Sequence, residues 1–124
     1  MNSILLVFDD YKEANFFEAN LAENKINVLK SSNLEEALAL AKKTVPEMIV
    51  INILYSENEI VEFCKKIKTE VKNTSILSLA DSENYYSSPY INHLIIKPIR
   101  PKLLLSIIRS LMNHEMINWY PSIV

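Results

Sequence analysis

Residues 3–10 read SILLVFDD, an apolar run of strand length that ends in two aspartates. The run from 3 to 8 shows no alternation of polar and apolar side chains, which is typical of a strand buried on both faces of a parallel sheet. A second run of this kind, residues 48–53 (MIVINI), has Asn52 as its polar residue near the carboxyl end. The two runs predict buried strands of an α/β sheet.

Segments with helical spacing of apolar residues separate these runs and three further ones. The other strands are expected at residues 27–31, 75–80 and 94–96. Helices are expected over 11–24, after the N-cap candidate Asn33, around Cys64 and from Pro101 onward. Strands that alternate with helices predict βα units, and right-handed crossovers close them most simply as one doubly wound sheet of five strands with helices on both faces.

Composition fits one globular domain and excludes several classes of function. The chain has 124 residues, 49% of them apolar, and a formal net charge of -2 without a basic stripe. Direct nucleic-acid binding is therefore not expected. The chain contains no glycine, and the Walker and dinucleotide-binding loops need glycine where the backbone approaches phosphate. Both nucleotide motifs are excluded.

Cysteine content and hydropathy give an expectation for the compartment. A single cysteine, Cys64, excludes an internal disulfide and a cysteine-based structural zinc site, and it fits a reducing environment. No apolar run reaches the ~18 residues of a membrane span, and residues 1–8 lack the basic flank of a signal peptide. We expect a cytoplasmic protein without membrane contact.

Polar residues follow four of the expected strands. Asp9 and Asp10 follow the first, Asn52 lies at the end of the third, and Lys97 follows the fifth. Asp81 follows the fourth strand, directly after Ala80. Ligands of doubly wound sheets bind beyond the carboxyl ends of the strands, so these residues are expected to share one site.

The chain at this point resembles the receiver domain of bacterial response regulators, the CheY-like superfamily. The matching segments are FDD (residues 8–10), PEMIVINIL (46–54) and IIKP (95–98), and the resemblance extends from Ser3 to about Met116. It implies a flavodoxin-like sheet in the order 2-1-3-4-5. Residues 1–118 would form the receiver-like domain and residues 119–124 a C-terminal tail.

The resemblance also implies roles for single residues. Asp9 and Asp10 match the acidic pair that holds Mg²⁺, and Lys97 matches the lysine that contacts the phosphoryl group. The phosphoacceptor position, however, holds Asn52. The two switch positions hold Ala80 in place of a hydroxyl residue and Leu94 in place of an aromatic one. The three departures all affect the phosphorylation switch.

The chemistry of these departures predicts a receiver that is not phosphorylated. A carboxylate can attack a phosphoryl donor, whereas the neutral carboxamide of Asn52 is a poor nucleophile. With an aspartate at position 52 the site would have a formal charge of -2. With Asn52 the formal charge is -1, the sum of Asp9, Asp10 and Lys97. Mg²⁺, which prefers hard oxygen ligands, is expected to bind weakly.

The segment between Ala80 and Lys97 is short for the family. It reads DSENYYSSPYINHLII, and Pro89 lies in its middle, so the helix between strands 4 and 5 is expected to be shortened or absent. Tyr85, Tyr86 and Tyr90 offer large amphipathic side chains and are the candidate interface for a protein partner or for self-association. The alternative is that they pack the shortened loop.

These residues together predict an atypical receiver that signals by protein contact and is not an enzyme. Two alternatives remain: a phosphorelay receiver with another acceptor, and a small α/β hydrolase that uses the strand-end acids. Each residue also has a structural interpretation. Asp9 and Asp10 could be N-terminal residues of a helix, Asn52 could tie strand ends together, and Lys97 could be a solvated residue before Pro98.

Overall fold

The computed structural model describes residues 3–81 and 88–112. These residues form one sheet of five parallel strands in the order β2-β1-β3-β4-β5, which confirms the predicted topology. The strands are β1 (Ser3–Phe8), β2 (Asn27–Ser31), β3 (Met48–Asn52), β4 (Ser75–Ala80) and β5 (His93–Ile96).

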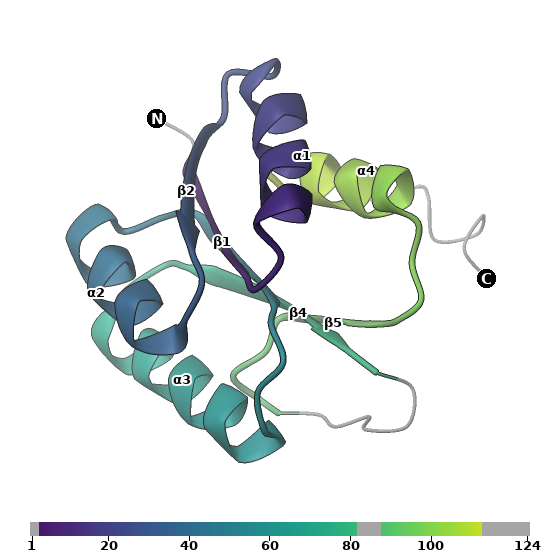
Figure 1. Cartoon of the computed structure of the whole chain (residues 1–124). Helices are drawn as coiled ribbons and strands as arrows, with labels where there is room; N and C mark the ends of the chain where they lie inside the picture. Colours follow the sequence, from purple (N-terminus) through teal and green to yellow (C-terminus); the bar gives the residue numbers. More distant parts are fainter. Residues whose placement is uncertain (1–2, 82–87, 113–124) are drawn as a thin grey trace.

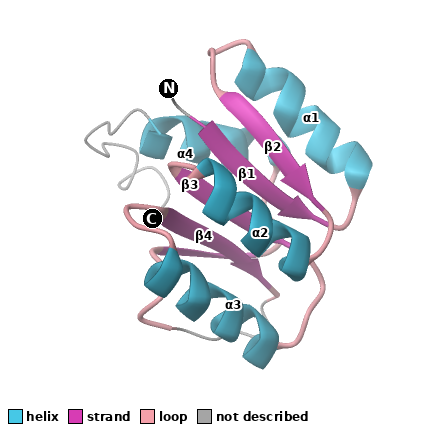
Figure 2. Ribbon diagram, turned by 90° about the vertical axis from the view of Figure 1, so that its left-hand side faces the viewer, coloured by secondary structure: helices cyan, strands magenta, loops and turns pink. Residues whose placement is uncertain are grey.

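Four helices of the described residues cover the sheet on its two faces. They are α1 (Tyr11–Ala22), α2 (Leu34–Thr44), α3 (Glu57–Glu70) and α4 (Pro101–Met112). Helices α1 and α4 lie on one face and α2 and α3 on the other (Figures 1 and 2). The described part of the connection between β4 and β5, residues 88–92, contains a turn and no helix. Within the described residues, no helix has the length and apolar character needed to cross a membrane.

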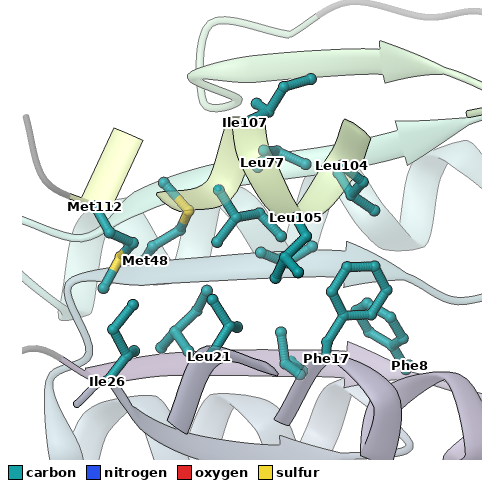
Figure 3. Packing of buried hydrophobic residues seen from close by; sticks show 14 of the residues in the cluster. Phe8, Phe17, Leu21, Ile26, Met48, Leu77, Leu104, Leu105, Ile107 and Met112 are labelled. Carbon is teal, nitrogen blue, oxygen red and sulfur yellow. The ribbon is translucent and has the colours of Figure 1, made fainter. Parts of the chain in front are cut away.

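The inner position of β1 and β3, with a core on each face of the sheet, explains why their sequences are continuously apolar. Successive side chains of β1 point to opposite faces, so Ile4, Leu6 and Phe8 join the core under α1 and α4. Leu5 and Val7 join the core under α2 and α3. Figure 3 shows the first of these cores, where Phe8 packs edge-to-face on Phe17 with ring centroids 5.6 Å apart.

Side-chain caps begin three of the helices. Asp10 caps α1, Asn33 caps α2 as the sequence predicted, and Ser56 caps α3. At α3 the cap is reciprocal, because the Glu59 side chain accepts a hydrogen bond from the Ser56 backbone. Each cap satisfies amide groups that the first helical turn leaves without a partner.

The absence of glycine has a visible effect on the backbone. The three described residues with positive φ are Lys25, Val45 and Asn73, at positions of the kind that glycine usually occupies. Val45 ends α2 with φ 47° and ψ 66°, a conformation that is unfavourable for a β-branched residue. The chain tolerates this backbone strain at an exposed helix end, directly before Pro46.

A polar network fixes β5 beside β4 although the described connection holds no helix. The Asn92 Oδ1 atom accepts hydrogen bonds from the Ile76 backbone N (2.8 Å) and from Lys68 Nζ (2.6 Å). Lys68 Nζ also donates to the Thr74 carbonyl oxygen at 2.7 Å. Helix α3 thus holds the start of β5 through one lysine.

Candidate functional site

Four of the sequence-predicted site residues lie together at the carboxyl ends of β1, β3 and β5: Asp9, Asp10, Asn52 and Lys97. They line a cavity of about 380 Å³, called here the strand-end pocket. Its lining residues are Asp9, Asp10, Glu13, Phe17, Asn52, Leu79, Lys97, Pro98, Ile99, Pro101 and Leu104. Parallel pairing places Phe8 opposite Asn52, so the residues that follow β1 lie next to the end of β3. Of the five polar residues expected to share one site, the four listed above line this pocket and Asp81 does not.

Both aspartates accept hydrogen bonds from backbone amides. Asp10 Oδ1 accepts from the backbone N of Lys12 (3.0 Å) and of Glu13 (3.3 Å), which is the geometry of a helix N-cap. Asp9 Oδ2 accepts from the backbone N of Leu54 at 3.0 Å and so ties β1 to the loop after β3. The structural interpretation of Asp10 is therefore correct, and both side chains remain exposed to solvent.

Asn52 is buried, with 8% of its surface exposed, and its carboxamide faces a carboxylate. The Asn52 Nδ2 atom donates a hydrogen bond to Glu13 Oε1 at 2.5 Å. An ionised aspartate at position 52 could not make this hydrogen bond, because its carboxylate has no donor to offer Glu13, whereas the Asn52 amide has one. At the position where the family resemblance implies a phosphoacceptor, the chain has a hydrogen bond between β3 and α1.

Glu13 is the pocket residue that sequence reasoning missed. Burial of its carboxyl group, and next the negative charge of Asp10, raise the pKa of Glu13 above the ordinary value of 4.5, while Lys97 and the Asn52 hydrogen bond oppose the shift. With Glu13 included, three carboxylates and one lysine give the pocket a formal charge of -2. The expected charge of -1 was wrong because it counted only residues at strand ends.

Glu13 enters the pocket from the first turn of α1. It lies three residues after the N-cap Asp10 and four residues before Phe17, which also lines the pocket. Residues three or four apart lie on the same face of a helix, so this spacing was the available sequence signal.

Lys97 lines the strand-end pocket, whereas Ala80 and Leu94, for which the resemblance implies a switch role, do not. Lys97 lines the pocket, and its backbone N donates to the Ala80 carbonyl oxygen at 2.8 Å. Ala80 is buried and pairs with Ile96 in the sheet. Leu94 is partly buried in the core under α2 and α3 and does not line the pocket.

The remaining sequence predictions concern residues farther from the pocket. Tyr90 is partly buried and packs against the core under α2 and α3. Tyr85 and Tyr86 lie outside the described residues, as does the tail at residues 119–124. Cys64 is fully buried, and burial raises the pKa of its thiol to about 12. This thiol therefore stays protonated and unreactive at neutral pH.

The oxygen atoms of the pocket suit Mg²⁺ in kind. This ion is usually bound through one or two carboxylates and keeps several waters, and Asp9 and Asp10 present exposed carboxylates. One oxygen of each already accepts from backbone amides. Over residues 3–81 and 88–112, no cluster of three or more histidine, cysteine, aspartate or glutamate side chains is arranged to hold a metal. The residues fit an ion that two aspartates and water would hold.

We predict that Glu13→Gln stabilises the protein near neutral pH. The pKa of Glu13 is higher in the folded protein than in the unfolded chain, so protonation of Glu13 stabilises the fold. This stabilisation is fully present below the unfolded-state pKa and is lost as the pH rises through the folded-state pKa. Glutamine keeps an acceptor oxygen for Asn52 and removes the charge that burial and Asp10 disfavour. Urea unfolding near neutral pH should give a higher midpoint for the variant.

The difference should vanish below about pH 3.5, where Glu13 is protonated in both states. Glu36→Gln is the matched control, because Glu36 occupies the same third position after the N-cap in α2 and is exposed. A lower midpoint for Glu13→Gln than for the unmodified chain near neutral pH would contradict this electrostatic account of the pocket.

No protein-family model matches the chain. Among curated proteins, histidine kinase P4 of Formosa agariphila is 32% identical over 74 residues, which cover 60% of this chain and 5% of that protein. Response regulator ArlR of Staphylococcus aureus is 24% identical over 119 residues, 93% of this chain. The chain spans about half the length of ArlR (54%).

A solved structure with a similar fold is also a response regulator receiver domain. A CheY-like response regulator receiver domain from Methanospirillum hungatei superposes with a TM-score of 0.75 over 91% of this chain and 95% of that one, at 14% sequence identity. Its likeness concerns the fold alone, while the similarity to ArlR extends along nearly the whole chain. The chain therefore has the fold of the CheY-like receiver domains, and curated response regulators are its relatives in sequence.

Proposed function

We propose that the chain is a receiver domain of two-component-type signalling that acts by protein contact and accepts no phosphate itself. The observation that carries this proposal is the hydrogen bond from Asn52 to Glu13 in the strand-end pocket. The receiver-like fold and the similarity to curated response regulators support the signalling role.

Two properties of the pocket oppose phosphorylation of residue 52. The carboxamide is neutral and a poor nucleophile, so it would not attack a phosphoryl donor. The approaching phosphoryl group is itself an anion, and it would enter a pocket whose three carboxylates outnumber one lysine. Asp9 and Asp10 would hold Mg²⁺ with water in this pocket, and the ion would offset part of the negative charge when bound.

The switch that reads a phosphate would also be missing. Ala80 has no hydroxyl group to bond a phosphoryl oxygen, and Leu94 has no ring to move in response. Leu94 instead packs into the core under α2 and α3. A receiver of this kind would present a constant surface to its partner.

Part of that surface is proposed to lie between Asp81 and Leu94. Tyr85, Tyr86 and Tyr90 would supply contact area at low entropic cost, since each tyrosine has few rotatable bonds. The contact of Tyr90 with the core supports a fixed position for this end of the segment. The proposed partner is a protein, either a signalling partner or a second copy.

We predict no covalent labelling when the chain is incubated with Mg²⁺ and acetyl phosphate. Intact-mass spectrometry should show an unchanged mass, because Asn52 cannot form an acyl phosphate. Gain of one phosphoryl group, labile to mild base, would refute the proposal and favour a phosphorelay receiver with another acceptor. Catalytic turnover of the phosphodonor would instead favour the hydrolase.

The controls restore the acceptor. Asn52→Asp should recover slow labelling, provided that Lys97 and the acidic pair retain their places around the pocket. The double variant Asn52→Asp/Glu13→Gln should label faster than Asn52→Asp alone. It removes the repulsion between two facing carboxylates and leaves glutamine as a hydrogen-bond donor to the new aspartate.

We further predict that Asn52→Asp binds Mg²⁺ more tightly than the unmodified chain. The substitution adds a carboxylate beside Asp9 and Asp10, and each added charge favours a divalent cation. Calorimetric titration should show a difference of about tenfold or more, while Lys97→Ala serves as the control for a change of one charge unit at the pocket edge. Equal affinity in Asn52→Asp and the unmodified chain would show that residue 52 does not contribute to the site.

The tyrosine surface has its own test. Because Tyr90 packs against the core, we expect the double variant Tyr85→Ser/Tyr86→Ser to probe the surface while keeping that core contact. Sedimentation velocity and cross-linking to the native partner should show weaker association, whereas Lys97→Ala should change little. If association is lost only in Lys97→Ala, the strand-end pocket is the contact site and the tyrosine proposal is wrong.

A further inference from the structure

A second hollow lies on the face of the molecule opposite α1 and α4. It is a groove of about 750 Å³ between the N-terminal halves of α2 and α3, called here the α2–α3 groove. Its lining residues include Glu35 and Leu38 on α2, Tyr55 before α3, and Glu59, Glu62 and Phe63 on α3. The two helices run side by side over the sheet in Figures 1 and 2. No residue of this groove belongs to the strand-end pocket.

Large apolar side chains form the floor of the groove. Leu34 and Phe63 are buried, and Leu38 and Tyr55 are partly buried and pack against the same core. Leu38 and Tyr55 therefore still present apolar surface that a binding partner could cover.

Negative charge dominates the rim of the groove. Glu35, Glu59 and Glu62 are exposed, and Lys66 is the one basic residue among the lining residues. Glu59 already accepts from the Ser56 hydroxyl at 2.8 Å, so its carboxylate is held in place by the capping box of α3. Glu35 on α2 and Glu62 on α3 bear the other two rim charges, one on each helix.

We infer that the α2–α3 groove binds a basic amphipathic segment of another protein. Large apolar side chains of the segment lie on the floor formed by Leu38, Tyr55 and Phe63, and its lysines or arginines pair with Glu35 and Glu62. This is the arrangement in which an amphipathic helix occupies an apolar groove through side chains at helical spacing. The inference goes beyond the proposed function, because it adds a binding surface distinct from the pocket and the tyrosine segment.

Charge complementarity favours a basic segment of another protein over the C-terminal residues 113–124 of this chain as the occupant of the groove. The C-terminal residues 113–124 (NHEMINWYPSIV) are apolar enough to cover the floor, but they contain no lysine or arginine and one glutamate. A segment of that composition brings no positive charge to the three rim carboxylates. A basic segment offsets them, and the negative rim also accelerates its encounter with the groove.

The test uses the full chain and a defined probe. The probe is a synthetic peptide of about 14 residues, made of lysine, leucine and alanine with leucines at i, i+3, i+4 and i+7. A scrambled peptide of the same composition has the same charge without an apolar face. NMR titration of ¹⁵N-labelled protein should show saturable shifts at amides around the groove with the patterned peptide and weaker, unsaturated shifts with the scrambled one.

Matched variants separate the groove from general attraction between opposite charges. Glu35→Gln/Glu62→Gln should weaken binding about fivefold, because exposed ion pairs each contribute modestly. Glu36→Gln/Glu57→Gln removes the same charge from the first turns of the same helices outside the groove lining, and it should change the affinity less than twofold. Leu38→Ala should weaken binding about tenfold through the floor while circular dichroism confirms the fold.

Three results would overturn the inference. The first is the absence of saturable shifts at the groove, and the second is equal weakening by the two double variants. The third is concentration-dependent dimerisation of the unmodified chain that Leu38→Ala abolishes, since the occupant would then be a second copy.

Discussion

Burial of the two central strands from both sides is the constraint on which the structure depends. Residues of β1 and β3 alternate between two cores, one under α1 and α4 and the other under α2 and α3. Leaving either face open would expose a row of leucine, isoleucine and valine side chains to water, at a free-energy cost of about 25 cal/mol per Å² of apolar surface. Helices must therefore cover both faces, and parallel crossovers then bring the carboxyl ends of all strands to one edge.

The chemistry of that edge differs from what the resemblance to response regulators would imply. At the position where the resemblance implies a phosphoacceptor, the Asn52 amide donates a hydrogen bond to Glu13, while Asp10 caps α1 and Asp9 holds the loop after β3. Each of these polar side chains has a structural partner. Phosphoryl transfer to residue 52 would need a free nucleophilic carboxylate there, and hydrogen-bond donors or a metal ion for the phosphoryl oxygens, so these hydrogen bonds support the proposal of a site that accepts no phosphate.

Most of the fold could be predicted from local sequence. All five strands were predicted to within one residue. Unbroken apolar runs placed β1 and most of β3, because a strand buried on both faces needs such a run, whereas the edge strand β2 (NVLKS) carries exposed polar residues. Helix ends were less predictable: α1 stops at Ala22, before the turn in which Lys25 takes a positive φ, although its pattern extended to residue 24. In α4, the adjacent residues Leu104 and Leu105 are both buried, as are Ile107 and Ile108, because a strongly apolar helix buries more than one narrow face.

The site was only partly predictable, for a physical reason. Asp9, Asp10, Asn52 and Lys97 follow strand ends, and strand ends meet by topology alone. Glu13 reaches the pocket from a helix, so its role depends on how α1 packs against the sheet, which no short motif encodes. Its inclusion changes the pocket charge and supplies the partner of Asn52.

The central claim is that Asn52 is held by the Glu13 carboxylate, and NMR titration tests it most directly. Carboxyl ¹³C shifts of Glu13 and the side-chain NH₂ signals of Asn52 would be followed across the acidic range. The account predicts a Glu13 pKa above 4.5 and Asn52 NH₂ shifts with the same midpoint, both lost in Glu13→Gln. Asn52 NH₂ signals that do not respond while Glu13 titrates would contradict it.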